Sequence, residues 1–300
     1  MNLDPQGRPL EHVAIVSGDD SLLLAASTGS ELLLLSLTQQ ENMLTGESTL
    51  QEERINLPQI AEPVKAIYMD PRKQWLYVLN GRAQADVFDL NSHQLNGRYK
   101  LLDDASAEVT ASSQLLGGIS LMVGNSKGGI SQWFMARGED GEPRLSHVRD
   151  FKLGDQPISS IAPEQRRKGF LALDKQGNLG IFHSTAHRTL LVENVAPSAG
   201  PLALSPRANR LILEQGGELR RFSLSNPHPE VSFSALWGKV WYESYDKPSY
   251  VWQSTAATTD FEPKLSLSPL TFGTLKAAFY AMILAAPLAI AAAVYTAYFM

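Results

Sequence analysis

The sequence contains no cysteine, so disulfide bonds and thiolate metal sites are excluded. Its lysines and arginines are scattered, and its net charge is −5. Because nucleic-acid backbones are bound by clustered cations, this composition argues against nucleic acid as a partner. Residues 1–20 lack a basic segment followed by an apolar one, so they do not read as a signal peptide.

Motifs for catalysis and nucleotide binding are also missing. There is no GxxxxGK[ST] loop, so the chain is not an ATPase of that class. His183 and His187 lie four residues apart, but their segment reads as a strand leaving into a turn, and not as a metal-binding helix. Asp103 and Asp104 fall in a turn, where carboxylates are usually solvated. We expect no catalytic residue, no cofactor and no metal.

A repeat fills the first 235 residues instead. Polar turns with a glycine recur every 40 to 52 residues, each between two apolar runs of strand length. These glycines are Gly29, Gly81, Gly129, Gly177 and Gly217. Another strand-like run comes before each pair of apolar runs, and a more polar strand-like run comes after it. Four short strands per period are typical of a β-propeller blade, and glycine suits tight hairpins because it adopts positive φ easily.

The sequence DVFDL at residues 86–90 takes the place of the Trp-Asp dipeptide of WD-type repeats. We predict a mostly β fold, with a WD-like β-propeller of about five visible blades over residues 1–235 and a C-terminal transmembrane α-helix. A β-sandwich is the alternative, but a sandwich has no reason to repeat in fours. Since seven blades are commoner than five, further blades before Met1 are one expectation.

An aromatic-rich junction covers residues 236–268. It contains Trp237, Trp241 and Trp252, interleaved with Tyr242, Tyr245 and Tyr250. Aromatic side chains next to a membrane span favour the interface, which accommodates both an apolar ring and a polar edge. They would pack equally well beneath the last blade, so the sequence leaves both arrangements open.

The chain ends in an apolar run without any charge over residues 277–300. This run is long enough to cross a bilayer, and we predict a transmembrane helix over residues 272–299. Its many alanines allow close helix packing, and Pro287 would kink it, as in a bundle of membrane helices. A buried helix of a soluble domain is the alternative. We expect the sequence to stop inside the first helix of a larger bundle.

The end of the chain resembles the opening helix of the permease domain of bacterial phosphate ABC transporters. Gly273, Thr274, Leu275, Pro287 and Tyr295 carry this resemblance. The junction is similar to that of a longer subfamily, in which a WD-like propeller lies between the first and second membrane helices. Its matching residues are Trp241, Glu243, Tyr245, Pro248, Trp252, Gln253, Ser254, Glu262, Lys264, Ser266, Leu267 and Pro269.

The resemblance implies a fragment of the permease subunit of an ATP-driven phosphate importer, with residues 269–300 as the truncated start of the permease domain. The implied partners are a second permease subunit, a separate ATPase subunit, a periplasmic phosphate-binding protein and membrane lipid. The implied location is the bacterial inner membrane, with the propeller in the periplasm. ATP hydrolysis would belong to the separate subunit, so this chain is not expected to be an enzyme.

Lys276 would meet phosphate at the mouth of the pathway or, as we favour, extend its charge to the membrane interface. Two other functions stay open. A membrane-anchored propeller scaffold that binds protein partners fits the chain, apart from the alanine-rich helix. A propeller enzyme is disfavoured by the lack of clustered catalytic groups.

Overall fold

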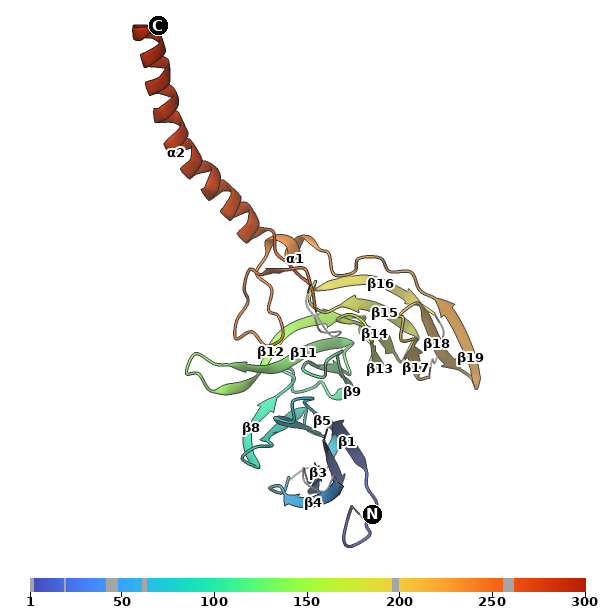
Figure 1. Cartoon of the computed structure of the whole chain (residues 1–300). Coiled ribbons are helices and arrows are strands. Elements are labelled where there is room, and N and C mark those ends of the chain that lie inside the picture. Colours follow the sequence, from blue (N-terminus) through green and yellow to red (C-terminus); the bar gives the residue numbers. More distant parts are fainter. Residues whose placement is uncertain (1–2, 19, 42–47, 61–63, 196–199, 256–261) are drawn as a thin grey trace.

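The computed structural model of this chain describes residues 3–18, 20–41, 48–60, 64–195, 200–255 and 262–300. In these residues, five antiparallel sheets of three or four strands follow one another in chain order along an open arc (Figure 1). A long helix leaves from the side of the arc. The fold is therefore mostly β with a C-terminal apolar helix, as predicted.

Within each sheet, strands that follow one another along the chain are hydrogen-bonded neighbours. The first sheet contains β1 (His12–Ser17), β2 (Ser21–Thr28), β3 (Glu31–Glu41) and β4 (Ser48–Asn56), and the second contains β5 (Val64–Met69), β6 (Trp75–Asn80), β7 (Gln84–Asp89) and β8 (Gln94–Lys100). The third contains β9 (Val109–Gln114), β10 (Leu121–Asn125), β11 (Gly129–Arg137) and β12 (Pro143–Lys152). The fourth contains β13 (Ile158–Pro163), β14 (Gly169–Asp174), β15 (Asn178–His183) and β16 (Arg188–Asn194), and the fifth contains β17 (Leu202–Leu204), β18 (Arg210–Gln215) and β19 (Glu218–Ser223).

Apolar packing joins consecutive sheets face to face. Four clusters of buried residues each contain side chains of two neighbouring sheets, from the first and second to the fourth and fifth. Every residue of β6 and β14 is buried, because these strands have a neighbouring sheet on both faces. Their continuous apolar runs are explained by this stacking, since a strand covered on one face alone would alternate apolar and polar residues.

The predicted glycines fall at the hairpins between the second and third strands. Gly29, Gly81, Gly177 and Gly217 lie in these turns, whereas Gly129 is the first residue of β11 and Gly128 makes the turn. One expectation was wrong: the fifth sheet has three described strands where a fourth was predicted. After β19 the chain instead enters a loop and the short helix α1 (Phe233–Trp237), so its third strand has no partner on that side among the described residues.

Gly128 gives a test of the hairpins. Its φ is +73°, and a Cβ atom there would overlap the carbonyl oxygen of Gly154. We expect Gly128→Ala to lower the free energy of unfolding by roughly 3 kcal/mol, from backbone strain and overpacking together. Gly141→Ala is the matched control, because its φ is +82° but nothing lies within 4 Å. Thermal unfolding followed by circular dichroism measures both, and equal losses would contradict the packing explanation.

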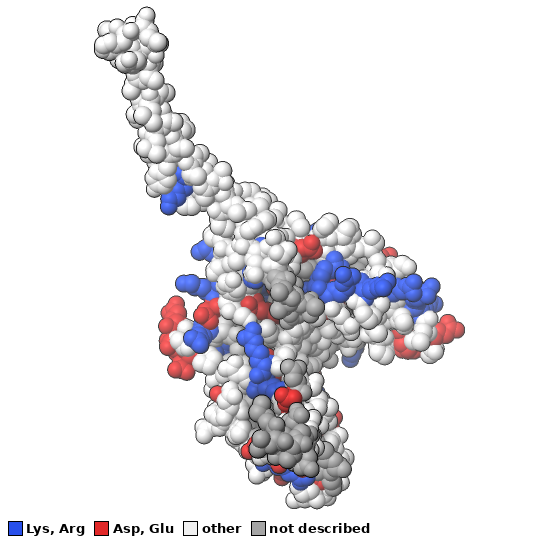
Figure 2. Space-filling view, in the orientation of Figure 1, with Lys and Arg blue, Asp and Glu red and all other residues white. Residues whose placement is uncertain are grey.

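The final elements are a small two-stranded sheet of β20 (Trp252–Gln253) and β21 (Lys264–Leu265), and helix α2 (Ser268–Phe299). α2 begins four residues before the predicted residue 272. Pro269 fits this earlier start, since a proline in the first helical turn loses no hydrogen bond. The helix continues through Pro287, and no residue of it is buried. Figure 2 shows α2 white along its length except for blue atoms near its base.

Candidate functional site

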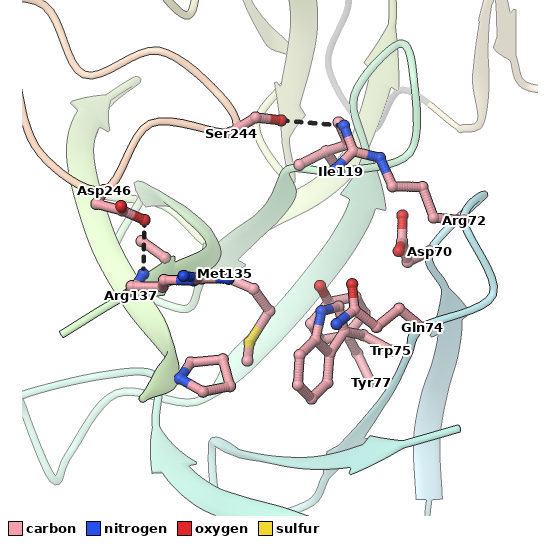
Figure 3. A pocket seen from close by; sticks show the side chains of 12 residues that line it. Asp70, Arg72, Gln74, Trp75, Tyr77, Ile119, Met135, Arg137, Ser244 and Asp246 are labelled. Carbon is pink, nitrogen blue, oxygen red and sulfur yellow. Dashed lines mark hydrogen bonds between the residues drawn. The ribbon is translucent and has the colours of Figure 1, made fainter. Parts of the chain in front are cut away.

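The junction is fastened to three consecutive sheets of the propeller. Arg72, in the turn before β6, donates from Nη2 to Ser244 Oγ at 3.2 Å (Figure 3). Arg149 of β12 donates from Nη2 to the carbonyl oxygen of Trp241 at 2.5 Å. Lys168, in the turn before β14, donates from Nζ to Glu243 Oε2 at 2.5 Å. The junction thus spans the second, third and fourth sheets on the side from which α2 leaves.

A buried group of charges lies at the centre of this attachment. Lys168 is 5% exposed, and its Nζ also donates to the carbonyl oxygen of Leu116 at 2.5 Å. Glu262 has a buried Oε1 without a hydrogen-bond partner. Burial, with a smaller effect of the Glu243 carboxylate, raises the pKa of Glu262 to about 7. Burial also lowers the pKa of Arg149 to about 10. The charges hold two parts of the chain together at the cost of desolvation.

The pH dependence of stability provides a test of the Glu262 environment. Its folded pKa of about 7 lies above the ordinary value of 4.5, so the unfolded chain loses this proton first as pH rises. The stability that Glu262 contributes therefore falls between about pH 4.5 and 7, by roughly 3 kcal/mol. We expect Glu262→Gln to raise the unfolding temperature at pH 8 more than at pH 5. Equal effects at the two pH values would show that Glu262 is not desolvated.

The aromatic residues of the junction divide into an inner and an outer group. Trp241 packs edge-on against Phe134 of β11, with ring centroids 5.6 Å apart, and Tyr242 is buried. Trp237, Tyr250 and Trp252 are exposed. Packing against the propeller is thus found for the inner group, and a membrane-interface position of the outer group stays a prediction. The partner of Trp241 belongs to the third sheet, and not to the last blade as expected.

Three other junction residues contact Lys264. Its Nζ donates to Gln253 Oε1 at 3.0 Å and lies 5.7 Å from the ring centroids of both Tyr242 and Tyr245. Cations over aromatic rings are stabilised by the ring quadrupole. Trp252 pairs with Leu265 across the β20–β21 ladder. Of the predicted junction residues, the structure therefore brings Gln253 and Lys264 together, and it places Glu243 against the propeller.

Several cavities border the junction, and two of them contain buried titratable groups. One, of about 360 Å³, lies between the second sheet, the third sheet and the junction (Figure 3). Its lining includes Asp70, whose Oδ1 is buried without a hydrogen-bond partner. Burial raises the pKa of this carboxyl group. The other, of about 420 Å³, is lined by Lys168, His183 and Glu262 among others. His183 Nδ1 accepts from the backbone N–H of Ala186 at 3.2 Å, and burial lowers the pKa of His183 to about 4. Among the described residues, no three His, Asp or Glu side chains are placed to hold a metal ion.

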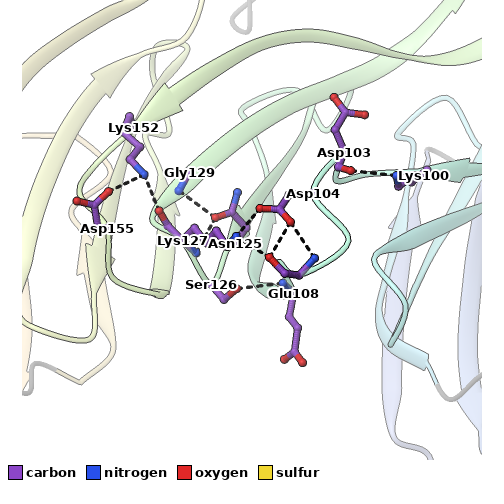
Figure 4. Close-up of polar contacts among 11 residues, drawn as sticks. Lys100, Asp103, Asp104, Glu108, Asn125, Ser126, Lys127, Gly129, Lys152 and Asp155 are labelled. Atoms are coloured by element: carbon purple, nitrogen blue, oxygen red, sulfur yellow. Dashed lines mark hydrogen bonds and ion pairs between the residues drawn. The ribbon is translucent and has the colours of Figure 1, made fainter.

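A second polar group lies between the second and third sheets, in the loop after β8 and the turn before β11 (Figure 4). Lys127 pairs with Asp104, and both side chains are about half exposed. Lys127 holds the pKa of Asp104 below its usual range. Asn125 Oδ1 accepts from the backbone N–H groups of Lys127 and Gly129, which shapes the turn. Asp103 and Asp104 are exposed turn residues, as predicted.

The predicted permease residues all lie in α2, away from the buried charges. Thr274 Oγ1 donates to the carbonyl oxygen of Leu270 at 3.0 Å. Lys276 Nζ lies 5.8 Å from the ring centroid of Tyr280, and nothing lies within 4 Å of a Cβ built on Gly273. Pro287 is inside the helix. None of these contacts tests a role in transport, which stays a prediction.

Sequence reasoning missed the propeller residues that hold the junction. Lys168 lies 75 positions from Glu243, Arg149 lies 92 from Trp241, and Arg72 lies 172 from Ser244. No local pattern marks these three cations, because each lies in an ordinary strand or turn. Only the spatial order of the sheets brings them to one side.

No family model matches the chain, and no curated protein matches it. Among solved structures, it is similar to the β-propeller domain of Cps50 (Swd1) from Myceliophteria thermophila, with a TM-score of 0.52 and 13% sequence identity. The match covers 73% of this chain and 72% of that chain. At this identity the likeness concerns the fold alone. The chain is a β-propeller protein with a C-terminal apolar helix.

Proposed function

We propose that the chain is part of the permease subunit of an ATP-driven phosphate importer, with its propeller as an accessory domain on the periplasmic side. One observation carries the membrane part of this proposal. α2 has 32 residues, is apolar on all sides, and buries none of them within the chain. A helix of this kind needs lipid or other membrane helices around it.

The attachment of α2 supports a role for the propeller close to the membrane. The backbone N–H of Leu267 donates to the carbonyl oxygen of Leu236 at 2.7 Å, directly before α2 begins. The N–H of Ser266 donates to the carbonyl oxygen of Val251 at 3.0 Å. These bonds tie the start of the helix to a junction that is itself held by three sheets, so a movement of α2 would be transmitted to the propeller.

The transport function is supported by the sequence resemblance of Gly273–Leu275, Pro287 and the junction to phosphate permeases. In this proposal a periplasmic binding protein delivers phosphate, a second permease subunit completes the pathway, and a separate ATPase drives it. The second candidate is a membrane-anchored propeller scaffold. It is favoured by the finding of one possible span in the described residues.

Bulky substitutions in α2 separate the two candidates. In a bundle, Ala289 and Ala292 would pack against other helices, and overpacking costs about 1–3 kcal/mol per site. We expect Ala289→Leu and Ala292→Leu to reduce phosphate uptake several-fold in cells that depend on this protein. Leu284→Ile is the control, since it keeps the side-chain volume. A lone anchor in lipid would tolerate all three, and unchanged uptake would contradict the permease proposal.

A further inference from the structure

We propose that exposed aromatic residues around the base of α2 dock on the lipid bilayer, so that α1 lies in the membrane interface beside the span. We call Phe233, Trp237, Tyr250 and Trp252 the interfacial patch. Their side chains are 81%, 42%, 46% and 42% exposed. This inference rests on the proposed insertion of α2, but it concerns a separate surface.

The patch lies at the first residues of α2. Ser268 Oγ donates to the carbonyl oxygen of Trp237 at 3.2 Å, which joins the end of α1 to the start of α2. Phe233 is one helical turn from Trp237, so both lie on one side of α1. Trp252 pairs with Leu265, three residues before α2 begins. Figure 1 shows α1 at the base of α2, on the side of the arc that faces the helix.

The charge pattern of α2 places this base at the membrane surface. Lys276 is followed by 24 residues without a charge, and about 20 such residues cross a hydrocarbon core of about 30 Å. The core therefore takes residues from this uncharged run, and the first two turns of α2, before Lys276, lie in the interface. Trp237 and Trp252 of the interfacial patch are tied to this base by Ser268 and Leu265. Lys276 then lies near the edge of the hydrocarbon, where its side chain reaches water.

The chemistry of the patch fits lipid better than a protein groove. Tryptophan and tyrosine favour the headgroup region because their rings are apolar and their N–H or O–H groups are polar. Lys239 Nζ lies 5.7 Å from the Tyr250 ring centroid, which adds a cation at the same place. Trp241 and Tyr242 belong to the same segment but pack inward, whereas the residues of the interfacial patch are exposed. The patch also lies beside the first residues of α2, whose apolar surface is extended and exposed and is not a closed pocket.

Quenching by brominated lipids tests this docking. The full chain would be placed in vesicles of phosphatidylcholine and phosphatidylglycerol whose acyl chains carry bromine near the headgroup or near the methyl end. Trp237 and Trp252 are two of five tryptophans, so shallow bromine is expected to quench up to about two fifths of the emission, and deep bromine much less. Trp237→Phe with Trp252→Phe should abolish the shallow quenching. Trp241→Phe, the inward-facing control, should keep it.

Protease protection and alkaline carbonate extraction of the same vesicles report the insertion of α2 independently. If α2 is inserted and shallow bromine does not quench, the docking inference is wrong while the membrane proposal stands. If the double variant keeps its quenching, the patch is not the contact and the inference is also wrong. If carbonate removes the chain from the vesicles, α2 is not inserted, and both the proposed insertion and the docking inference are wrong. Circular dichroism confirms that each variant keeps its β-sheet content.

Discussion

A chain that ends at Leu267 is expected to move from the membrane fraction to the soluble fraction with its propeller folded. The main exposed apolar surface belongs to α2, including Phe272, Leu284 and Leu288, and no residue of α2 is buried by the sheets. Exposed surfaces of this size need lipid or a partner. Ending at Leu267 keeps the hydrogen bond from its N–H to Leu236 and the β20–β21 ladder.

Fractionation after carbonate treatment and far-ultraviolet circular dichroism measure this result. Carbonate removes proteins that are bound only at the surface, so weak docking of the interfacial patch does not disturb the comparison. A chain that ends at Thr255 is the control, because it lacks β21 and Glu262 but also lacks α2. It should be soluble and less stable. If the chain ending at Leu267 stays in carbonate-washed membranes, α2 is not what holds the protein there.

Lys168→Ala is expected to lower the free energy of unfolding by about 3–5 kcal/mol, the usual cost of leaving a buried charge without its partner. Lys168 pairs with Glu243, and Glu262 lies close enough that Lys168 acts on its charge. Removing the lysine leaves the Glu243 carboxylate near Glu262, whose pKa it already raises. For a domain of this size, the loss corresponds to roughly 10 °C in unfolding temperature.

Glu243→Ala should cost less than Lys168→Ala, because the Glu262 carboxyl remains near the lysine and can ionise once its neighbour is gone. Lys127→Ala is the matched control: its ion pair with Asp104 is about half exposed, so little change in unfolding temperature is expected. Limited proteolysis of the junction shows whether a loss of stability reflects detachment from the propeller. Similar effects of Lys168→Ala and Lys127→Ala would mean that the buried pair is not stabilising.

The sequence by itself determined the local structure. Strand positions followed from short apolar runs and glycine turns such as those at Gly81 and Gly177, because hairpins depend on neighbouring residues. The α2 helix was predictable because a long uncharged apolar run forms few structures other than a helix. The repeat of four strands predicted the propeller. Among the described residues, only the fifth sheet departed from it, since the segment after β19 enters a loop and α1.

Only the tertiary structure decided how the junction is held. The aromatic content of residues 236–268 did not show that Trp241 turns inward while Trp252 turns outward, because that choice depends on Phe134 and Leu265. The raised pKa of Glu262 depends on burial by residues remote in the chain. Long-range packing sets these features: a side chain's surroundings are fixed once the sheets are stacked, and no nearby sequence pattern records them.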